Sequence, residues 1–271
     1  MGGVCSPVTR YPLRATRYMK AAALIPARWG STRFPGKPVH KIAGKPLIQH
    51  VWERCREAEA FDRIIIATDD RRIAEAVRGF GAEAALTSGE HPSGTDRIAE
   101  VARNLTEVDL IFNVQGDEPL IAPELLGTLV RTLAGDREID LITAAVPIHG
   151  DEARSEHVVK VVTDRKGDAL YFSRSVIPFA RGPGDPGYLK HLGIYGYRRN
   201  ALLEFVTLAP SPLEQAERLE QLRALQNGMK LRVIVSQTHS IGVDTLADAD
   251  AVEGLMLSGM GRSTSSRNRM E

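Results

Sequence analysis

Five positively charged side chains fall within a short stretch near the start of this chain that contains no acidic residue. The cations are Arg28, Arg33, Lys37, Lys41 and Lys45, with Gly30 and Gly36 between them. Arginine grips phosphate oxygens with a planar fork and lysine adds a mobile point charge. Glycine lets backbone N–H groups approach a ligand closely. The pattern predicts a loop that binds a polyphosphate, and the alternative is a solvated basic loop.

The spacing of this loop excludes the two commonest nucleotide-binding loops. A Walker A motif needs four residues between its glycines and then Lys-Ser/Thr, whereas five residues separate Gly30 from Gly36 and Lys37 is followed by Pro38. A G-x-G-x-x-G motif does not follow the apolar run 21–26 either. A nicotinamide or flavin enzyme is therefore disfavoured.

Carboxylates follow a second apolar run. The segment 109–119 reads D-L-I-F-N-V-Q-G-D-E-P, so Gln115, Asp117 and Glu118 stand at the end of a predicted strand. Ligands of parallel sheets bind at the carboxyl ends of strands. Mg²⁺ typically takes one or two carboxylates together with phosphate oxygens and water. We therefore predict a magnesium site at Asp117, with Asp244 as a second carboxylate; in the alternative interpretation each aspartate only caps a turn or helix.

Apolar runs rich in Ile and Val alternate along the chain with helical patterns. The predicted strands are 21–26, 63–68, 109–114, 140–147, 158–163, 191–197 and 231–235, and the predicted helices are 46–57, 95–105 and 211–227. Such alternation indicates a mostly parallel sheet with helices on both faces. The expected fold is a single α/β domain of Rossmann-like, three-layer type, spanning 21–260. Residues 1–20 are predicted to be a disordered or mis-annotated extension, and 261–271 a polar tail.

Charge and composition exclude several classes of function. The 271 residues are 43% hydrophobic and 25% charged, which is ordinary for a globular protein. Residues 1–20 carry +4 and 261–271 carry +2, so a net charge of +1 leaves −5 on the body. An acidic body disfavours nucleic-acid binding, and no apolar run is as long as a membrane span. Cys5 and Cys55 are the only cysteines, so we expect no disulfide and a reducing, cytoplasmic compartment.

A set of motifs, in order and with compatible spacing over roughly residues 21–255, resembles one family. The motifs are P-A-R-x-x-S-T-R-F-P-G-K-P at 26–38, S-G-T-D-R at 93–97, N-V-Q-G-D-E-P at 113–119, Y-F-S-R at 171–174, H-L-G-I-Y-G-Y-R at 191–198, L-E-Q-L-R at 219–223 and G-V-D-T at 242–245. The chain thereby resembles the 3-deoxy-manno-octulosonate cytidylyltransferases, or CMP-Kdo synthetases. That family has a nucleotide-diphospho-sugar transferase type of fold and transfers CMP from CTP to the anomeric hydroxyl of the sugar acid Kdo, for lipopolysaccharide synthesis.

The resemblance implies roles for particular residues. It assigns catalysis to Arg28, Lys37 and Asp117, and magnesium to Asp117 and Asp244. The implied nucleotide-binding residues are Ala27, Arg28, Arg33, Lys37, Ser93, Thr95, Arg97 and Gln115. The implied sugar-acid residues are Gln115, Arg174, His191, Tyr195, Glu220 and Gln221. The family also implies a homodimer.

The residue types agree with a sugar-acid acceptor. Kdo carries a carboxylate and several hydroxyls, so its pocket needs a forked cation such as Arg174 and a mixed set of donors and acceptors. Three other functions remain as alternatives. They are a sibling cytidylyltransferase acting on sialic acid or on a sugar or polyol phosphate, a metal-dependent glycosyltransferase, and a non-catalytic nucleotide-binding regulator.

Overall fold

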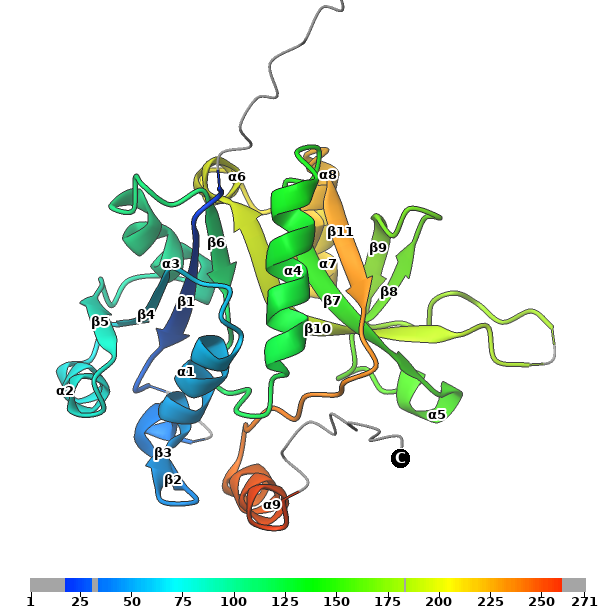
Figure 1. Cartoon of the computed structure of the whole chain (residues 1–271). Helices are drawn as coiled ribbons and strands as arrows, with labels where there is room; N and C mark the ends of the chain where they lie inside the picture. Colours follow the sequence, from blue (N-terminus) through cyan, green and yellow to red (C-terminus); the bar gives the residue numbers. More distant parts are fainter. Residues whose placement is uncertain (1–17, 31–33, 183, 260–271) are drawn as a thin grey trace, which may run out of the picture.

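The strands of the main sheet bring the ends of the predicted motifs together. The computed structural model describes residues 18–30, 34–182 and 184–259. In these residues nine strands form one sheet, in which seven follow the order β11-β7-β10-β6-β1-β4-β5, while β8 pairs with β10 and β9 (Figure 1). Their bounds are β1 Ala21–Ala27, β4 Arg63–Thr68, β5 Glu83–Leu86, β6 Leu110–Asn113, β7 Leu141–Ile148, β8 Lys160–Thr163, β9 Ala169–Ser173, β10 Tyr188–Arg198 and β11 Leu231–Val235.

Most neighbours along the sheet are parallel. Strand β1 pairs in parallel with β4 and β6, and the β4/β5 and β7/β11 pairs are also parallel. Strand β10 runs antiparallel between β6 and β7, with a register break between Leu192 and Tyr195. The predicted mostly parallel, mixed sheet is confirmed. All seven predicted strands are present, whereas the short β5 and β9 were missed.

Helices cover both faces of the sheet, as the alternating pattern predicted. Helices α1 (Leu47–Glu57) and α4 (Pro123–Gly135) bury residues such as Val51 and Leu129 in the core on one face. Helices α3 (Gly94–Arg103), α6 (Arg199–Phe205) and α8 (Gln221–Gln226) belong to a second core that includes Ile98 and Leu202. Helix α2 (Arg71–Gly79) joins the first core, and the short α5 (Gly150–Ala153) follows β7.

The predicted single helix 211–227 is wrong in one respect. It begins as expected with a capping box between Ser211 and Glu214, but it divides into α7 (Pro212–Glu217) and α8. The break lies at Arg218, which has φ 55 in the left-handed region. A left-handed residue ends an α-helix by turning the chain.

A small satellite cluster stands apart from the two cores. It packs α9 (Leu246–Leu257) against the hairpin of β2 (Lys41–Ile42) and β3 (Lys45–Pro46), with Phe34 and Val243 in its centre. The Glu253 carboxylate accepts a 2.6 Å hydrogen bond from the backbone N–H of Ala43. This packing holds the segment that contains Asp244 beside the basic loop.

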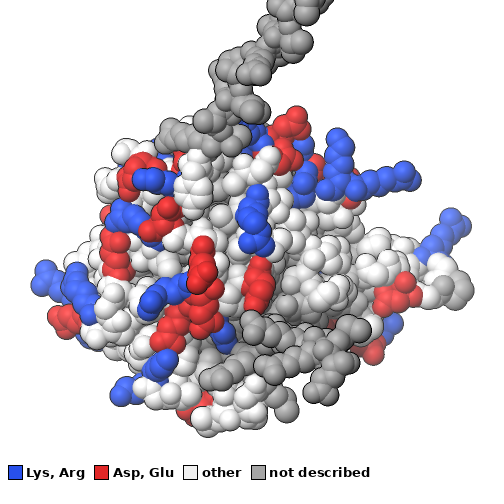
Figure 2. Space-filling model, in the orientation of Figure 1, with Lys and Arg blue, Asp and Glu red and all other residues white. Residues whose placement is uncertain are grey.

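Charged side chains of both signs are spread over the visible face of the described residues, where Lys and Arg are interspersed with Asp and Glu (Figure 2). None of the helices in the described ranges is both long and apolar enough to cross a membrane. Cys55 is a buried free thiol, and burial raises its pKa. Residues 1–17, which include Cys5, and the tail 261–271 lie outside the described residues, so the predictions about both ends stay predictions.

Candidate active site

Most of the predicted nucleotide and metal residues line one cavity of about 470 Å³. They reach it from the end of β1, the start of α3, the end of β6 and the segment before α9. Of the predicted residues, those lining it are Ala27, Arg28, Lys37, Ser93, Arg97, Gln115, Asp117 and Asp244. We call this the donor cavity. Of the other two predicted nucleotide residues, Arg33 lies outside the described residues, and Thr95 is buried and does not line the cavity.

The loop after β1 is shaped by a glycine that no other residue would replace easily. Gly36 has φ 71, and its N–H donates a 3.1 Å hydrogen bond to the carbonyl of Trp29. A Cβ at this position would meet the Trp29 ring at 3.2 Å. The Arg72 guanidinium lies 3.4 Å from the centroid of the same ring, a close cation–π contact. These contacts fix the turn that leads into the short 3-10 helix Lys37–Val39.

Two more glycines let backbone segments meet at the floor of the donor cavity. A Cβ at Gly116 would lie 2.9 Å from both the Pro26 carbonyl oxygen and Ile48 Cδ1. A Cβ at Gly94 would lie 3.3 Å from Pro26 Cγ. The ends of β1 and β6 and the start of α3 therefore converge only because these positions carry no side chain. Asp117 follows Gly116 directly and takes its place from this contact.

Lys37 and the two predicted metal carboxylates meet at one point. The Lys37 ammonium donates to Asp117 Oδ2 at 2.8 Å, to Asp244 Oδ1 at 3.2 Å and to the Val243 carbonyl at 2.8 Å. The Asp117 and Asp244 carboxylates are thus close enough to contact the same cation. In the part of the chain that the structure describes, no group of three or more His, Cys, Asp or Glu side chains gathers as a metal site. The donor set fits Mg²⁺ if a triphosphate and water complete its oxygen ligands.

The start of α3 forms the opposite wall of the donor cavity. Ser93 caps the helix by accepting a hydrogen bond from the N–H of Asp96 at 3.2 Å. The N-terminus of a helix favours negative charge because its N–H groups are unpaired and its dipole is positive there. Arg97 is buried, donates to Thr87 Oγ1 at 2.6 Å and pairs with Asp69 at 3.2 Å. The Arg97 guanidinium is therefore held by protein partners, and it contributes a positive charge to this wall of the donor cavity.

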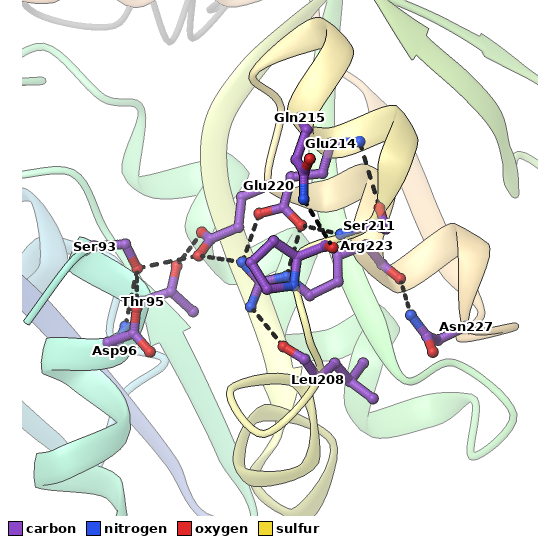
Figure 3. A network of polar contacts seen from close by, with 11 residues as sticks. Ser93, Thr95, Asp96, Leu208, Ser211, Glu214, Gln215, Glu220, Arg223 and Asn227 are labelled. Atoms are coloured by element: carbon purple, nitrogen blue, oxygen red, sulfur yellow. Dashed lines mark hydrogen bonds and ion pairs between the residues drawn. The ribbon is translucent and has the colours of Figure 1, made fainter.

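Glu220 joins this wall to the predicted acceptor residues (Figure 3). Its carboxylate accepts hydrogen bonds from Ser93 Oγ at 3.1 Å and from Thr95 Oγ1 at 2.7 Å. Arg223 lies 3.7 Å from the same carboxylate and is itself held by Glu214 in a two-pronged pair. Burial raises the pKa of Glu220, while the hydrogen bonds from Thr95 and Ser93 and the charge of Arg223 oppose that shift. Glu220 thus connects the nucleotide side to α8.

His191 and Tyr195 lie on β10 around its register break. The His191 ring stands between Phe172 and Tyr195, with ring centroids 5.1 and 5.3 Å away. Its Nε2 lies 3.0 Å from the Thr143 hydroxyl, which donates to the Ile194 carbonyl at 2.6 Å. Desolvation lowers the pKa of His191 to about 3 and raises that of Tyr195. Both rings are therefore neutral at physiological pH.

The other predicted acceptor residues have different environments. Gln115 lines the donor cavity and donates from Nε2 to the Gly193 carbonyl at 3.0 Å, which ties β6 to β10. Gln221 is buried, and its Nε2 has no hydrogen-bond partner among the described residues. Arg174 donates from Nε to the Glu217 carbonyl at 3.1 Å and from Nη1 to the Glu156 carbonyl at 3.1 Å. The acceptor side is thus distributed over β6, β10, α8 and the end of β9.

Three residues that the sequence analysis missed support these positions. His91 lines the donor cavity and contacts Glu100. It directly precedes the Pro-Ser-Gly-Thr segment, so the motif at 93–97 could have identified it. Glu217 accepts from Ser173 Oγ at 2.6 Å and from the N–H of Arg174 at 3.0 Å. Lys160 is fully buried and donates to three carbonyls, of Ser155, Val158 and Arg174. No signal in the sequence marked Glu217 or Lys160, since their partners are distant or are backbone atoms.

Comparison with known proteins places this site in a family. The sequence model of the family described as cytidylyltransferase matches residues 22–231. A 3-deoxy-manno-octulosonate cytidylyltransferase of Myxococcus xanthus is 51% identical over 238 residues, which are 88% of this chain and 96% of that protein. The chain belongs to the 3-deoxy-manno-octulosonate cytidylyltransferase family. The resemblance found in the sequence motifs is confirmed.

Other members of the family and a solved structure agree. A 3-deoxy-manno-octulosonate cytidylyltransferase of Geobacter metallireducens is 50% identical, covering 86% of this chain and 96% of that protein. A solved structure described as CMP:2-keto-3-deoxy-manno-octonic acid synthetase complexed with CTP matches with a TM-score of 0.86 and 44% identity, over 89% of this chain and 99% of that one. A cytidylyltransferase of Leptospira borgpetersenii shares only the fold, at 19% identity and a TM-score of 0.61.

Proposed function

We propose that this 3-deoxy-manno-octulosonate cytidylyltransferase transfers CMP from CTP to the anomeric hydroxyl of Kdo, forming CMP-Kdo and pyrophosphate. The observation that carries this proposal is the joining of the two predicted halves by direct hydrogen bonds. Thr95 Oγ1 reaches Glu220 at 2.7 Å and Gln115 Nε2 reaches the Gly193 carbonyl at 3.0 Å. A nucleotide in the donor cavity would therefore lie beside the acceptor residues of β10 and α8.

The residues of the donor cavity supply positioning and charge. Arg28 and Lys37 would bind the triphosphate, and the start of α3 would present its N–H groups to phosphate oxygens. Asp117 and Asp244 would hold Mg²⁺. The bound ion would neutralise phosphate charge and polarise the α-phosphate. Transfer then depends on orientation and on stabilising the charge that develops on the leaving group.

The acceptor residues would orient the sugar acid for in-line attack. The oxygen of the anomeric hydroxyl bonds to the α-phosphorus, the bond from that phosphorus to the β-phosphate bridge breaks, and the hydroxyl proton is released. Arg174 would bind the carboxylate of Kdo, while the free amide N–H of Gln221 and the neutral rings of His191 and Tyr195 would contact its hydroxyls. This direct displacement involves no covalent enzyme intermediate, and the buried Cys55 thiol, whose pKa is raised, is a poor candidate nucleophile.

A pyrophosphate-release assay with an acceptor panel tests this function. CTP with Kdo should release pyrophosphate, whereas CTP with sialic acid or with a sugar phosphate should not, and UTP should replace CTP poorly. Release with another acceptor in preference to Kdo would identify a sibling cytidylyltransferase. Turnover of a nucleotide-sugar without pyrophosphate would identify a glycosyltransferase, and binding of CTP without turnover would identify a regulator.

We also propose that the enzyme is a cytoplasmic homodimer that serves lipopolysaccharide synthesis. Strands β8 and β9 and the long loop after β9 project from the sheet in Figure 1. The large apolar side chains Leu170 and Phe179 in this region are 62% and 85% exposed. Exposed apolar side chains on a projecting element favour burial against another chain. Size-exclusion chromatography with light scattering should give twice the monomer mass, and Phe179→Asp should shift the protein towards monomer.

A further inference from the structure

The Lys37 ammonium occupies the position at which Asp117 and Asp244 converge. Its three contacts, to both carboxylates and to the Val243 carbonyl, are all 3.2 Å or shorter. The Lys37 side chain is only 14% exposed, whereas those of Asp117 and Asp244 are 34% and 64% exposed. The two carboxylates thus face the solvent-filled cavity, with a cation that belongs to the protein between them.

We propose that Lys37 is an internal competitor for the divalent-cation site: it fills the Asp117–Asp244 pair of the free enzyme and excludes a metal until a triphosphate draws its ammonium away. The inference rests on the proposed function in taking this pair as the metal site. It adds that the site is closed in the free protein, and that the residue which closes it is one that binds the nucleotide.

Competition follows from the charges and distances. A directly bound divalent cation lies about 2.0–2.6 Å from its carboxylate oxygens, and Lys37 uses one oxygen from each of the same two carboxylates. Two cations on one carboxylate pair repel each other strongly at such separations. A metal ion must therefore either displace the Lys37 ammonium or bind beside it against electrostatic repulsion. Either way, the affinity of the carboxylate pair for the metal is reduced.

The surrounding structure holds the ammonium in this place. The backbone of Lys37 begins a 3-10 helix after the Gly36 turn, which is fixed against Trp29. The Val243 carbonyl, a third acceptor, comes from the segment that the satellite cluster packs against β2 and β3. The four-carbon stem of lysine nevertheless allows its head to move without a change in the backbone.

A triphosphate in the donor cavity supplies the force that opens the site. Lys37 and Arg28 both line this cavity, so phosphate oxygens would compete with the two carboxylates for the ammonium. When Lys37 turns to the phosphates, the carboxylate pair loses its cation and gains affinity for a metal. Binding of nucleotide and binding of metal at this pair are then coupled, and by linkage each strengthens the other.

Titration with Mn²⁺ in the absence of nucleotide tests the inference, with free Mn²⁺ measured by electron paramagnetic resonance. The full-length Lys37→Met variant should bind one Mn²⁺ about tenfold or more tighter than the wild type, because it removes the ammonium that lies between the two carboxylates. Lys37→Gln, which keeps a donor for the Val243 carbonyl, should show the same tightening. Lys37→Arg keeps the charge and should stay as weak as the wild type.

Two controls locate the effect. Lys45→Met removes another cation of the same loop, one that pairs with Glu53 at 2.8 Å, and should leave Mn²⁺ affinity unchanged. Adding Asp117→Asn to Lys37→Met should abolish the tight site. As a second measurement, Mn²⁺ should raise the melting temperature of Lys37→Met by more than that of the wild type.

Equal or weaker Mn²⁺ binding by both Lys37→Met and Lys37→Gln overturns the inference, as does a tight site that survives Asp117→Asn. The proposed function is judged by a different result, the release of pyrophosphate from CTP and Kdo by the unmodified enzyme. An active wild type with no gain of Mn²⁺ affinity in the lysine variants would reject the competitor role alone.

Discussion

Asp117 and Lys37 face an open cavity, whereas His191 and Glu220 lie among protein groups that already engage their polar atoms. In the donor cavity the two carboxylates are partly solvated, since the side chains of Asp117 and Asp244 are 34% and 64% exposed. On the acceptor side desolvation dominates, since it lowers the pKa of His191 to about 3 and raises that of Glu220. The two regions therefore differ in solvation: the Asp117 carboxylate of the donor cavity is partly exposed, whereas the His191 ring of the acceptor side is desolvated and neutral.

The largest effect should come from removing charge in the donor cavity. Asp117→Asn keeps the size of the side chain and an acceptor for Lys37 but loses the negative charge that would hold Mg²⁺. We expect the rate of pyrophosphate release to fall by about 10²- to 10³-fold, as when one stabilising group is removed from other sites of charge development. Circular dichroism should show an unchanged fold.

Asp151→Asn is the matched control, because that carboxylate is 97% exposed and pairs with Arg154 in its own turn. It should retain wild-type turnover. An Asp117→Asn enzyme that stays within a few-fold of wild type would remove Asp117 from the metal site.

The next effect should separate the two substrates. Arg174→Ala removes the proposed partner of the Kdo carboxylate, so the KM for Kdo should rise by about ten- to a hundredfold while the KM for CTP changes little. Steady-state kinetics with each substrate varied in turn would measure both constants. Arg165→Ala, in the exposed turn between β8 and β9, should change neither. An increase confined to CTP would move Arg174 to the donor half.

A third effect concerns pH and is expected of His191 in the acceptor half. An unfolded histidine has a pKa near 6.5, whereas His191 in the folded protein has a pKa of about 3. Between these values the unfolded chain binds a proton that the folded protein does not, so stability is lost as the pH falls below 6.5. From pH 7 to pH 5 the cost at this single site is about 2 kcal/mol.

Urea unfolding of the wild type and of His191→Asn at pH 7 and pH 5 would measure that cost. The wild type should lose more of its free energy of unfolding on acidification than the variant, because groups such as Glu220 titrate in both proteins and cancel. His149→Asn, at an exposed histidine, should follow the wild type. Equal pH dependence in the wild type and in His191→Asn would contradict the desolvated environment of that ring.

The sequence predicted the donor half better than the acceptor half for a physical reason. Arg28 directly follows β1 and Asp117 lies in the loop after β6, and strand ends of a parallel sheet share one edge. Their convergence is therefore predictable from local patterns. The position of the Lys37 ammonium between the two proposed metal carboxylates was not predictable, because it depends on the packing of α9 against the β2–β3 hairpin.

Sequence patterns on the acceptor side gave residue types but not contacts. The break at Arg218 divides the predicted helix 211–227, and this division places Glu217 beside β9 and Glu220 beside α3. The sequence around Arg218 does not predict a left-handed backbone, because glycine and asparagine are the usual residues at such a helix end. Glu217 and the buried Lys160 were not foreseen because their partners are distant in the sequence or are backbone atoms.

The smallest expected effect lies at the bond that joins the two halves. Thr95→Val keeps the shape of the side chain but removes the hydroxyl that donates to Glu220 at 2.7 Å. A lost hydrogen bond to the partly buried Glu220 carboxylate should lower kcat/KM for Kdo by about tenfold, although Thr95 does not line the donor cavity. Thr207→Val, whose hydroxyl donates to a carbonyl within its own exposed turn, should have no effect.

A double-mutant cycle decides whether that loss acts through Glu220. If Thr95 only positions Glu220, then Thr95→Val should cost much less in a Glu220→Gln background than in the wild type, because the partner of the hydroxyl has already lost its charge. Additive losses would mean that the two side chains act separately, and that the acceptor half is ordered without help from the wall of the donor cavity. Coupled losses would show that a change at the start of α3 reaches the sugar acid through this single carboxylate.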